Sequence, residues 1–77
     1  MVKIWRVKFQ NYSTHDVTAR TAKDAIAKAE KEFLKDAADD RKEWIESGKS
    51  VKDAPSPPEK LLRDEPISSV ELIVEVP

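Results

Sequence analysis

One helical stripe of small apolar residues constrains the fold of this chain most strongly. Residues Thr21-Ala22-Lys23-Asp24 form a capping box, with Thr21 as the N-cap and Asp24 at position N3. At about 100° per residue, the apolar residues that follow share one face: Ala22, Ala25, Ile26, Ala29, Phe33 and Ala37. Because alanine side chains are small, they let a helix lie close to a sheet. The pattern therefore predicts a helix with one buried face.

This helix is expected to cover about residues 22–47. Its opposite side carries charged residues, which we expect to face solvent: Lys28, Lys31, Glu32 and Lys35. Asp40 continues the apolar stripe, where a buried and unpaired carboxylate would be costly. We therefore expect one long helix that outlasts the sheet, although a break near Asp39 is an open alternative. Gly48 is a natural residue on which to end the helix.

Three other segments alternate apolar and polar residues with the period of two that is typical of strands. They cover residues 2–9, about 14–20, and 69–76. The first two are separated by a short polar turn and so predict a hairpin. Alternation directs the following side chains toward the helix: Trp5, Val7, Phe9, Val17, Ala19, Val70, Leu72, Val74 and Val76.

The predicted order is therefore β-β-α-β, an α+β fold in a single domain over residues 1–77. The simplest sheet is three-stranded and antiparallel with strand order 2-1-3, and the long helix packs on one of its faces. An antiparallel register that places Ile4 opposite Ile73 and Arg6 opposite Glu71 matches an apolar pair and a base–acid pair.

A proline-rich connector over residues 49–66 links the helix to the last strand. Prolines at positions 55, 57 and 58 exclude regular strand pairing. Ser56 is a candidate N-cap for a single helical turn through Leu61 and Leu62, which would place one or both leucines under the long helix.

Composition excludes several kinds of functional site. Hydrophobic residues are 39% of 77, or 30 residues, and eight are alanine, which leaves 22 larger apolar side chains. That number suffices for one helix on one sheet without a deep pocket. The absence of cysteine excludes disulfides, thiolate metal sites and a cysteine nucleophile. With one histidine and one glycine, we expect no metal centre, no cofactor and no glycine-rich phosphate loop.

His15 is the only histidine available for acid–base catalysis. Asp16 is adjacent, but neighbouring residues in a strand point to opposite faces, so the two would not hydrogen-bond well. Carboxylate pairs such as Asp39-Asp40 lie in hydrophilic segments, whereas a hydrolase needs two carboxylates in one dry cleft. We therefore expect no catalytic residues and a protein that is not an enzyme.

The charges nearly cancel, with a formal net charge of −1. Residues 1–38 carry a net +3 and residues 39–77 a net −4. Such a chain has no overall field to hold it on nucleic acid or on an anionic membrane. Nothing resembles a signal peptide, and no segment approaches the ~18 apolar residues of a membrane span. We expect a soluble, cytoplasmic protein that does not associate with membranes.

The uncovered side of the predicted sheet is the candidate interaction surface. Its expected members are Ile4, Arg6, Lys8, Asp16, Thr18, Arg20, Glu71, Ile73 and Glu75. An apolar pair among charges of both signs is typical of a small protein interface. The alternatives are a solvated face and a nucleic-acid-binding face that uses the three basic residues. The last would also need exposed aromatic side chains for base stacking, and the strand aromatics are expected on the opposite face.

Two further features could contact a partner. Trp44 lies beyond the apolar stripe, so it either closes the core against the connector or stays partly exposed as an anchor. A three-stranded sheet leaves two unpaired edges, to which a partner strand or a second copy can add. We expect a monomer or a homodimer formed through a strand edge.

The start of the chain resembles a recurrent small module. The pattern V-x-A-x-(S/T)-x-x-(D/E)-A-I-x-x-A is met by Val17, Ala19, Thr21, Asp24, Ala25, Ile26 and Ala29. It is similar to the start of DpnD/PcfM-like proteins and other tiny phage and mobile-element proteins, and the β-β-α-β build is comparable to that of some phage anti-CRISPR proteins. The resemblance covers about residues 3–30 and carries over no functional residues. It implies a phage or mobile-element origin, where such proteins act mostly by binding host proteins.

These features predict a small non-enzymatic protein-binding module, an accessory protein that binds a host protein and modulates it as an inhibitor or adaptor. The expected contact residues are Ile4, Arg6, Lys8, Arg20, Glu71, Ile73 and Trp44. The alternative is a nucleic-acid-binding accessory protein that uses its basic cluster, Arg6, Lys8 and Arg20.

Overall fold

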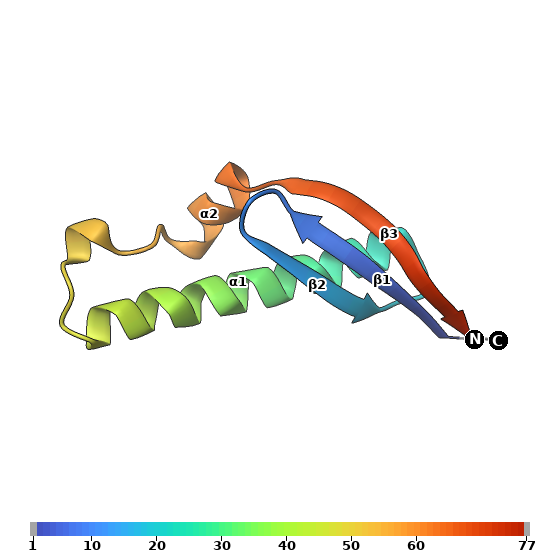
Figure 1. The fold of residues 1–77 in the computed structure, drawn as a ribbon, viewed down its shortest axis with the longest axis horizontal. Helices are drawn as coiled ribbons and strands as arrows, with labels where there is room; N and C mark the ends of the chain where they lie inside the picture. The colour runs from blue at the N-terminus through green and yellow to red at the C-terminus, as the bar shows by residue number, and fades with distance from the viewer. Residues whose placement is uncertain (1, 77) are drawn as a thin grey trace.

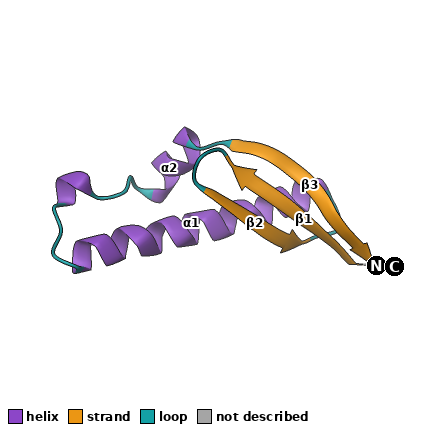
Figure 2. Cartoon of the chain, viewed as in Figure 1, coloured by secondary structure: helices purple, strands orange, loops and turns teal. Residues whose placement is uncertain are grey.

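The computed structural model describes residues 2–76, which form a three-stranded sheet with a long helix on one face (Figure 1). In chain order the elements are β1 (Val2–Phe9), β2 (Ser13–Thr18), α1 (Ala22–Glu46), the short 3₁₀ turn η1 (Val51–Asp53), α2 (Pro58–Asp64) and β3 (Ile67–Val76). The sheet is antiparallel with strand order β2-β1-β3 (Figure 2). The predicted fold class and strand order are confirmed, and α2 is an additional short helix.

The helix α1 begins and ends where its capping residues predict. Thr21 is the N-cap, and its side-chain oxygen accepts the backbone N–H of Asp24 at 3.2 Å. At the other end Ser47 is the C-cap, and Gly48 adopts a φ of 80°, the left-handed conformation that glycine favours. The helix is continuous past Asp40, whose carboxylate is exposed and accepts a hydrogen bond of 2.8 Å from the Tyr12 hydroxyl. Because that carboxylate is solvated and paired, no break is needed.

The core lies between α1 and the inner face of the sheet, the face that points toward the helix. Every fourth residue of α1 from Ala25 to Ala37 is fully buried: Ala25, Ala29, Phe33 and Ala37. The sheet contributes buried side chains from β1 and β2 and from the residue after β2: Val7, Phe9, Val17 and Ala19. The Phe9 and Phe33 ring centroids lie 4.5 Å apart, and Tyr12 packs on Phe33 at 4.9 Å. The alanines thus bring the helix close, and two phenylalanines fill the space that remains.

The register of β3 differs from the prediction in its second half. Arg6 lies opposite Glu71 as predicted, but Ile4 lies opposite Val74 instead of Ile73. The pairing passes from Trp5–Leu72 to Ile4–Val74, so a β-bulge at residue 73 leaves Ile73 without a β1 partner. One extra residue reverses the alternation that follows it.

This bulge corrects the predicted facing of the C-terminal valines. Val74 and Val76 pair with Ile4 and Val2, which point away from the helix, so both belong on the opposite face of the sheet and not in the core. Glu75 lies opposite Lys3, and their charged groups are 3.8 Å apart. The prediction assumed strict alternation along the strand, which the bulge interrupts.

The connector folds back along α1 and is tied to the hairpin. Pro57, and not Ser56, is the N-cap of α2, and Pro58 takes the first helical position. Leu61 and Leu62 pack against the core, as predicted. The hairpin turn is held by the backbone N–H of Asn11, which donates to the Glu65 carboxylate at 3.0 Å.

The helix is longer than the sheet it covers. Its 25 residues span about 37 Å, whereas the eight residues of β1 span about 26 Å. The end of α1, η1 and the chain that follows η1 therefore project as an arm, and the molecule measures 49 × 20 × 15 Å (Figure 1). Trp44 belongs to this arm: its indole N–H donates to the Ser50 carbonyl at 2.8 Å, and the Lys49 ammonium lies 4.6 Å from the ring centroid.

Truncation of Phe33 tests this core. Phe33→Ala should lower the free energy of unfolding by ~3–5 kcal/mol, because it removes a fully buried ring that packs on Phe9 and Tyr12. Lys31→Ala, at an exposed position of the same helix, should change it by less than ~0.5 kcal/mol. Urea unfolding followed by circular dichroism measures both. Equal losses in the two variants would contradict the assigned helix face.

Candidate functional site

The sheet face that points away from α1, called the outer face below, contains most of the residues predicted to contact a partner. On β1 it comprises Val2, Ile4, Arg6 and Lys8, because Trp5, Val7 and Phe9 point toward the helix. Pairing adds Val76, Val74, Glu71 and Ser69 from β3. On the other side it adds Thr18, Asp16 and Thr14 from β2. Both helices lie away from this face (Figure 2).

One end of the outer face is apolar and open to solvent. Val2, Val74 and Val76 are 46%, 40% and 50% exposed, and the half-buried Ile4 lies between them in the register. Residues directly opposite in an antiparallel pair have adjacent side chains. These four residues, called the valine patch below, therefore form one continuous apolar surface that nothing in the described chain covers.

The other end of the outer face is charged. The Arg6 guanidinium donates to both carboxylate oxygens of Asp16, at 3.0 and 3.2 Å, and Glu71 lies opposite Arg6 on β3. The hydrogen bond from Arg6 lowers the pKa of Asp16, and the same bond raises the pKa of Arg6. Both groups are therefore ionised at neutral pH. Lys8 lies between Thr14 and Ser69, two uncharged neighbours.

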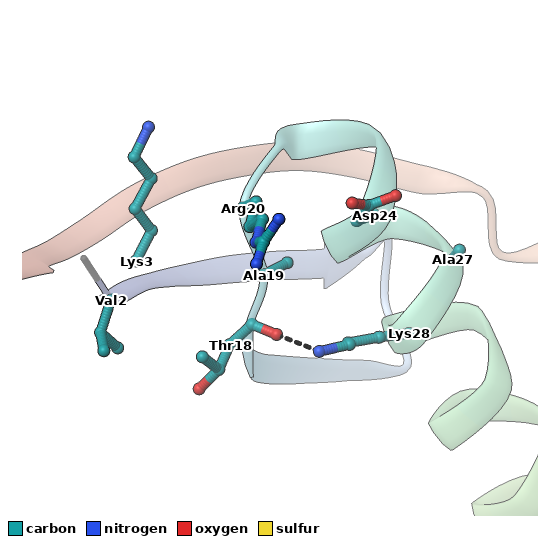
Figure 3. Close-up of a pocket in the computed structure, with 8 residues that line it drawn as sticks. All are labelled: Val2, Lys3, Thr18, Ala19, Arg20, Asp24, Ala27 and Lys28. Atoms are coloured by element: carbon teal, nitrogen blue, oxygen red, sulfur yellow. Dashed lines mark hydrogen bonds between the residues drawn. The ribbon is translucent and has the colours of Figure 1, made fainter.

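Arg20 is separated from this cluster. β2 ends at Thr18, so Arg20 lies beyond the strand and lines a hollow of about 530 Å³ at the start of α1. Figure 3 shows the Lys28 ammonium reaching the Thr18 carbonyl at this hollow, with Asp24 on the first turn of the helix. Of the three residues of the predicted basic cluster, Arg6 is thus paired with Asp16, and Arg20 lies beyond the end of β2, at a hollow that Val2 and Thr18 also line.

Two other predicted contact residues also lie off the apolar part of the outer face. Ile73 is half-buried at the β-bulge, and Trp44 is half-buried on the arm, where it contacts the start of the connector. Strict alternation made Ile73 a member of the outer face, and the bulge gives that position to Val74. The exposed valines Val2, Val74 and Val76 are the residues that the sequence analysis missed.

His15 has partners that sequence reasoning did not identify. It is on the inner side of β2 and only 9% exposed, with its ring edge-on to Phe9 at 5.5 Å. Its Nε2 lies 2.8 Å from the Ser13 hydroxyl, and its Nδ1 lies 3.3 Å from the Glu32 carboxylate on α1. Glu32 contacts the buried ring from the flank of α1 and is itself exposed to solvent as predicted, with 54% of its side chain accessible. Glu32 directly precedes the buried Phe33 in the sequence, so Glu32 lies on the flank of the helix beside the buried stripe. This position was the one sequence feature that could have indicated a contact between Glu32 and the sheet.

The order Ser13–His15–Glu32 matches the sequence of contacts in a hydroxyl nucleophile, base and acid array. In this protein, however, the imidazole is nine-tenths buried, and both of its nitrogens have partners within the fold. Ser13 is only two residues from His15 on the same strand, so the hydroxyl satisfies a buried ring nitrogen. The contacts therefore connect β2 to α1.

A third region carries three carboxylates beside the only tyrosine. Tyr12, Ser13, Asp36, Asp39 and Asp40 line a hollow of about 460 Å³. Within residues 2–76, no three histidine, aspartate or glutamate side chains are disposed to hold a metal ion. Over the same residues, no helix has the length and apolar composition needed to cross a membrane.

Comparison with known proteins adds no relative. No family model matches the chain, and it matches neither a curated protein nor a solved structure. The resemblance over residues 3–30 to small phage and mobile-element proteins stays a prediction.

Titration of the single tyrosine tests the contact between the hairpin and α1. Burial, then the hydrogen bond to Asp40 and the charges of Asp40 and Asp36, raise the pKa of Tyr12 from 10.0 to about 12. Because the folded state favours the neutral phenol, this contribution to stability is complete below pH 10 and is lost as the pH rises toward 12.

The ultraviolet absorbance of the phenolate gives the midpoint directly, since the chain has one tyrosine. Asp40→Asn should lower the midpoint, because it removes the charge that opposes ionisation. Asp39→Asn, at the adjacent exposed position, should leave it unchanged. A midpoint near 10 in the folded wild-type protein would contradict the Tyr12–Asp40 contact.

Proposed function

We propose that the protein is a non-catalytic module that binds another protein through the outer face of its sheet. The observation that carries this proposal is the valine patch. Val2, Val74 and Val76 are each at least 40% exposed and adjacent in the register, on a face that neither helix covers. Isolated exposed apolar residues are ordinary, but a continuous apolar patch rimmed by polar residues is typical of an interaction surface.

The charges next to the valine patch support a protein partner. Arg6 and Asp16 form an ion pair whose groups are about half exposed, Glu71 lies opposite Arg6, and Lys8 is an exposed cation beyond them. The partner therefore meets both signs of charge beside an apolar area. In such interfaces the apolar contacts supply affinity, and the charges favour one orientation and one partner.

The same face is poorly suited to nucleic acid. Arg6 is engaged with Asp16, and Arg20 lies at the start of α1. The aromatic residues of β1, Trp5 and Phe9, point toward the helix, so they cannot stack on bases from the outer face. We therefore favour a protein partner over the nucleic-acid alternative. A host protein as that partner is inferred only from the sequence resemblance.

The absence of catalysis is part of the same proposal. The contacts of His15 explain its burial without a substrate: Ser13 satisfies one ring nitrogen, and Glu32 satisfies the other. Covalent labelling of Ser13 by a fluorophosphonate, seen by mass spectrometry of the intact protein, would contradict a non-catalytic role.

Replacement of two patch valines tests the interface. The double variant Val74→Lys with Val76→Lys should bind the partner protein at least about tenfold more weakly than the wild type. The reason is that two cations replace apolar contact area at the centre of the proposed interface. The matched control is Ile45→Lys with Val51→Lys, which removes two apolar residues of similar exposure from the arm and adds the same charge. The control should bind as the wild type does.

The partner is captured from a bacterial lysate, purified, and titrated by calorimetry against both double variants. Thermal melts establish that each variant is folded. Equal affinity in the wild type and the patch variant, or an equal loss in both variants, would contradict the proposed face. So would sedimentation that shows the patch occupied by a second copy of this chain.

A further inference from the structure

A groove runs between the free edge of β2 and α1. It has a volume of about 600 Å³ and is lined by Asp16, Val17, Thr18, Lys28, Lys31, Glu32 and Lys35. One wall is a strand at the edge of the sheet, because the strand order is β2-β1-β3 and β2 pairs with β1 alone. The other wall is a helix that carries three lysines. This region, called the β2 groove below, is separate from the valine patch.

The backbone of β2 offers unused hydrogen-bonding groups to this groove. The N–H of Ala19 donates to the Lys3 carbonyl on β1 at 3.1 Å. In an antiparallel pair the direction of the backbone groups alternates, so the odd-numbered residues of this segment direct their N–H and C=O groups toward β1. The even-numbered residues Thr14, Asp16 and Thr18 direct their N–H and C=O groups toward the free edge of the sheet. The Thr18 carbonyl accepts the Lys28 ammonium from across the groove, which agrees with this direction. An extended chain laid along β2 would meet these groups at every second residue.

The charges of the groove are uneven. Asp16 is neutralised by Arg6, and the Glu32 carboxylate is held by the ring of His15. Within residues 2–76, no carboxylate lies within 4.0 Å of Lys28, Lys31 or Lys35. Of the two carboxylates that line the groove, only Glu32 is not paired with an arginine. The groove therefore has an excess of positive charge, although the net charge of the chain is −1.

We propose that the β2 groove binds an extended acidic segment of a partner protein, which adds to the sheet as a fourth strand beside β2. Its backbone would pair with the N–H and C=O groups of Thr14 and Asp16 and with the Thr18 N–H, since the Thr18 carbonyl already accepts the Lys28 ammonium. Its carboxylates would meet the lysines of α1. Side chains on one face of a strand recur every ~6.8 Å, and Lys28 and Lys35 are separated by about 10 Å along the helix axis. Two acidic residues in an acidic-x-acidic spacing therefore fit within the lysine row.

The backbone edge distinguishes this ligand from other anions. A free phosphate or an oligonucleotide could meet the lysines, but neither supplies the alternating N–H and C=O groups that β2 leaves unpaired. This inference is independent of the proposed function, because the valine patch and the β2 groove share no residue. Of the residues on the outer face, Asp16 and Thr18 also line the groove. Failure of one proposal leaves the other intact.

A designed peptide tests the groove. The probe is a fluorescein-labelled peptide of about eight residues that alternates glutamate and threonine, and fluorescence anisotropy reports its binding at low salt. We expect its binding to slow hydrogen exchange at the Thr14, Asp16 and Thr18 amides, measured by NMR. A lysine–threonine peptide should bind at least about tenfold more weakly. A peptide with proline in place of threonine should also bind weakly, since proline has no N–H to donate.

Charge reversal on the helix provides the matched variants. Lys31→Glu with Lys35→Glu should weaken binding of the glutamate–threonine peptide by about tenfold or more. Lys52→Glu with Lys60→Glu makes the same change in net charge at exposed positions outside the groove and should alter binding by less than about twofold. All four lysines are exposed, so both variants should fold, and thermal melts establish this.

The proposal would be overturned by no binding of the peptide at about 1 mM, by equal binding of the proline peptide, by equal losses in the two lysine variants, or by exchange protection confined to residues outside β2. Displacement of the peptide by a single-stranded oligothymidylate of equal charge, with the same dependence on Lys31 and Lys35, would identify a general anion site and would also overturn it.

Discussion

The packing of one alanine-lined helix against one face of the sheet is the interaction on which the rest of this structure depends. Ala25, Ala29, Phe33 and Ala37 repeat every four residues and are fully buried. A residue every fourth position drifts only about 40° around a helix per step, so one stripe faces one surface. With 22 larger apolar side chains in the chain, a second covering layer is not available. The outer face is uncovered for this reason.

The polar side chains at the margin of this contact connect the helix to the sheet. His15 joins β2 to Glu32 on one flank of α1, and Tyr12 joins the hairpin to Asp40 where the sheet ends. Within residues 2–76, every buried side-chain nitrogen or oxygen has a hydrogen-bond partner. On the surface, the charged residues of the outer face lie beside the exposed valines, and those of the β2 groove lie beside a strand edge that pairs with no other strand.

Local patterns in the sequence were sufficient for the element order, the helix caps and most of the core. Thr21, Gly48 and the alanine stripe each act within one or two turns, so a single sequence shows them. The bulge at Ile73 was not predictable, because it depends on how β3 pairs with a strand more than sixty residues earlier. It moved Val74 and Val76 from the expected core to the outer face.

Long-range contacts also determined the candidate site. The Arg6–Glu71 register followed from matching charges, but the Arg6–Asp16 pair and the His15–Glu32 contact required the fold. Arg20 looked like a member of the basic cluster because β2 was expected to run to residue 20, whereas the strand ends at Thr18. Residues at strand ends and bulges are thus where sequence reasoning was least informative, and the valines of the proposed interface follow one such bulge.

Methyl NMR with a soluble paramagnetic relaxation agent tests the central claim most directly, namely that one face of the sheet is packed and the other is open. The account predicts strong broadening of the Val2, Val74 and Val76 methyl signals and little broadening for Val7 and Val17, which are at most 6% exposed. Protection of Val74 and Val76 to the level of Val7 in the monomeric protein would contradict it. That result would return these valines to the core and remove the open face.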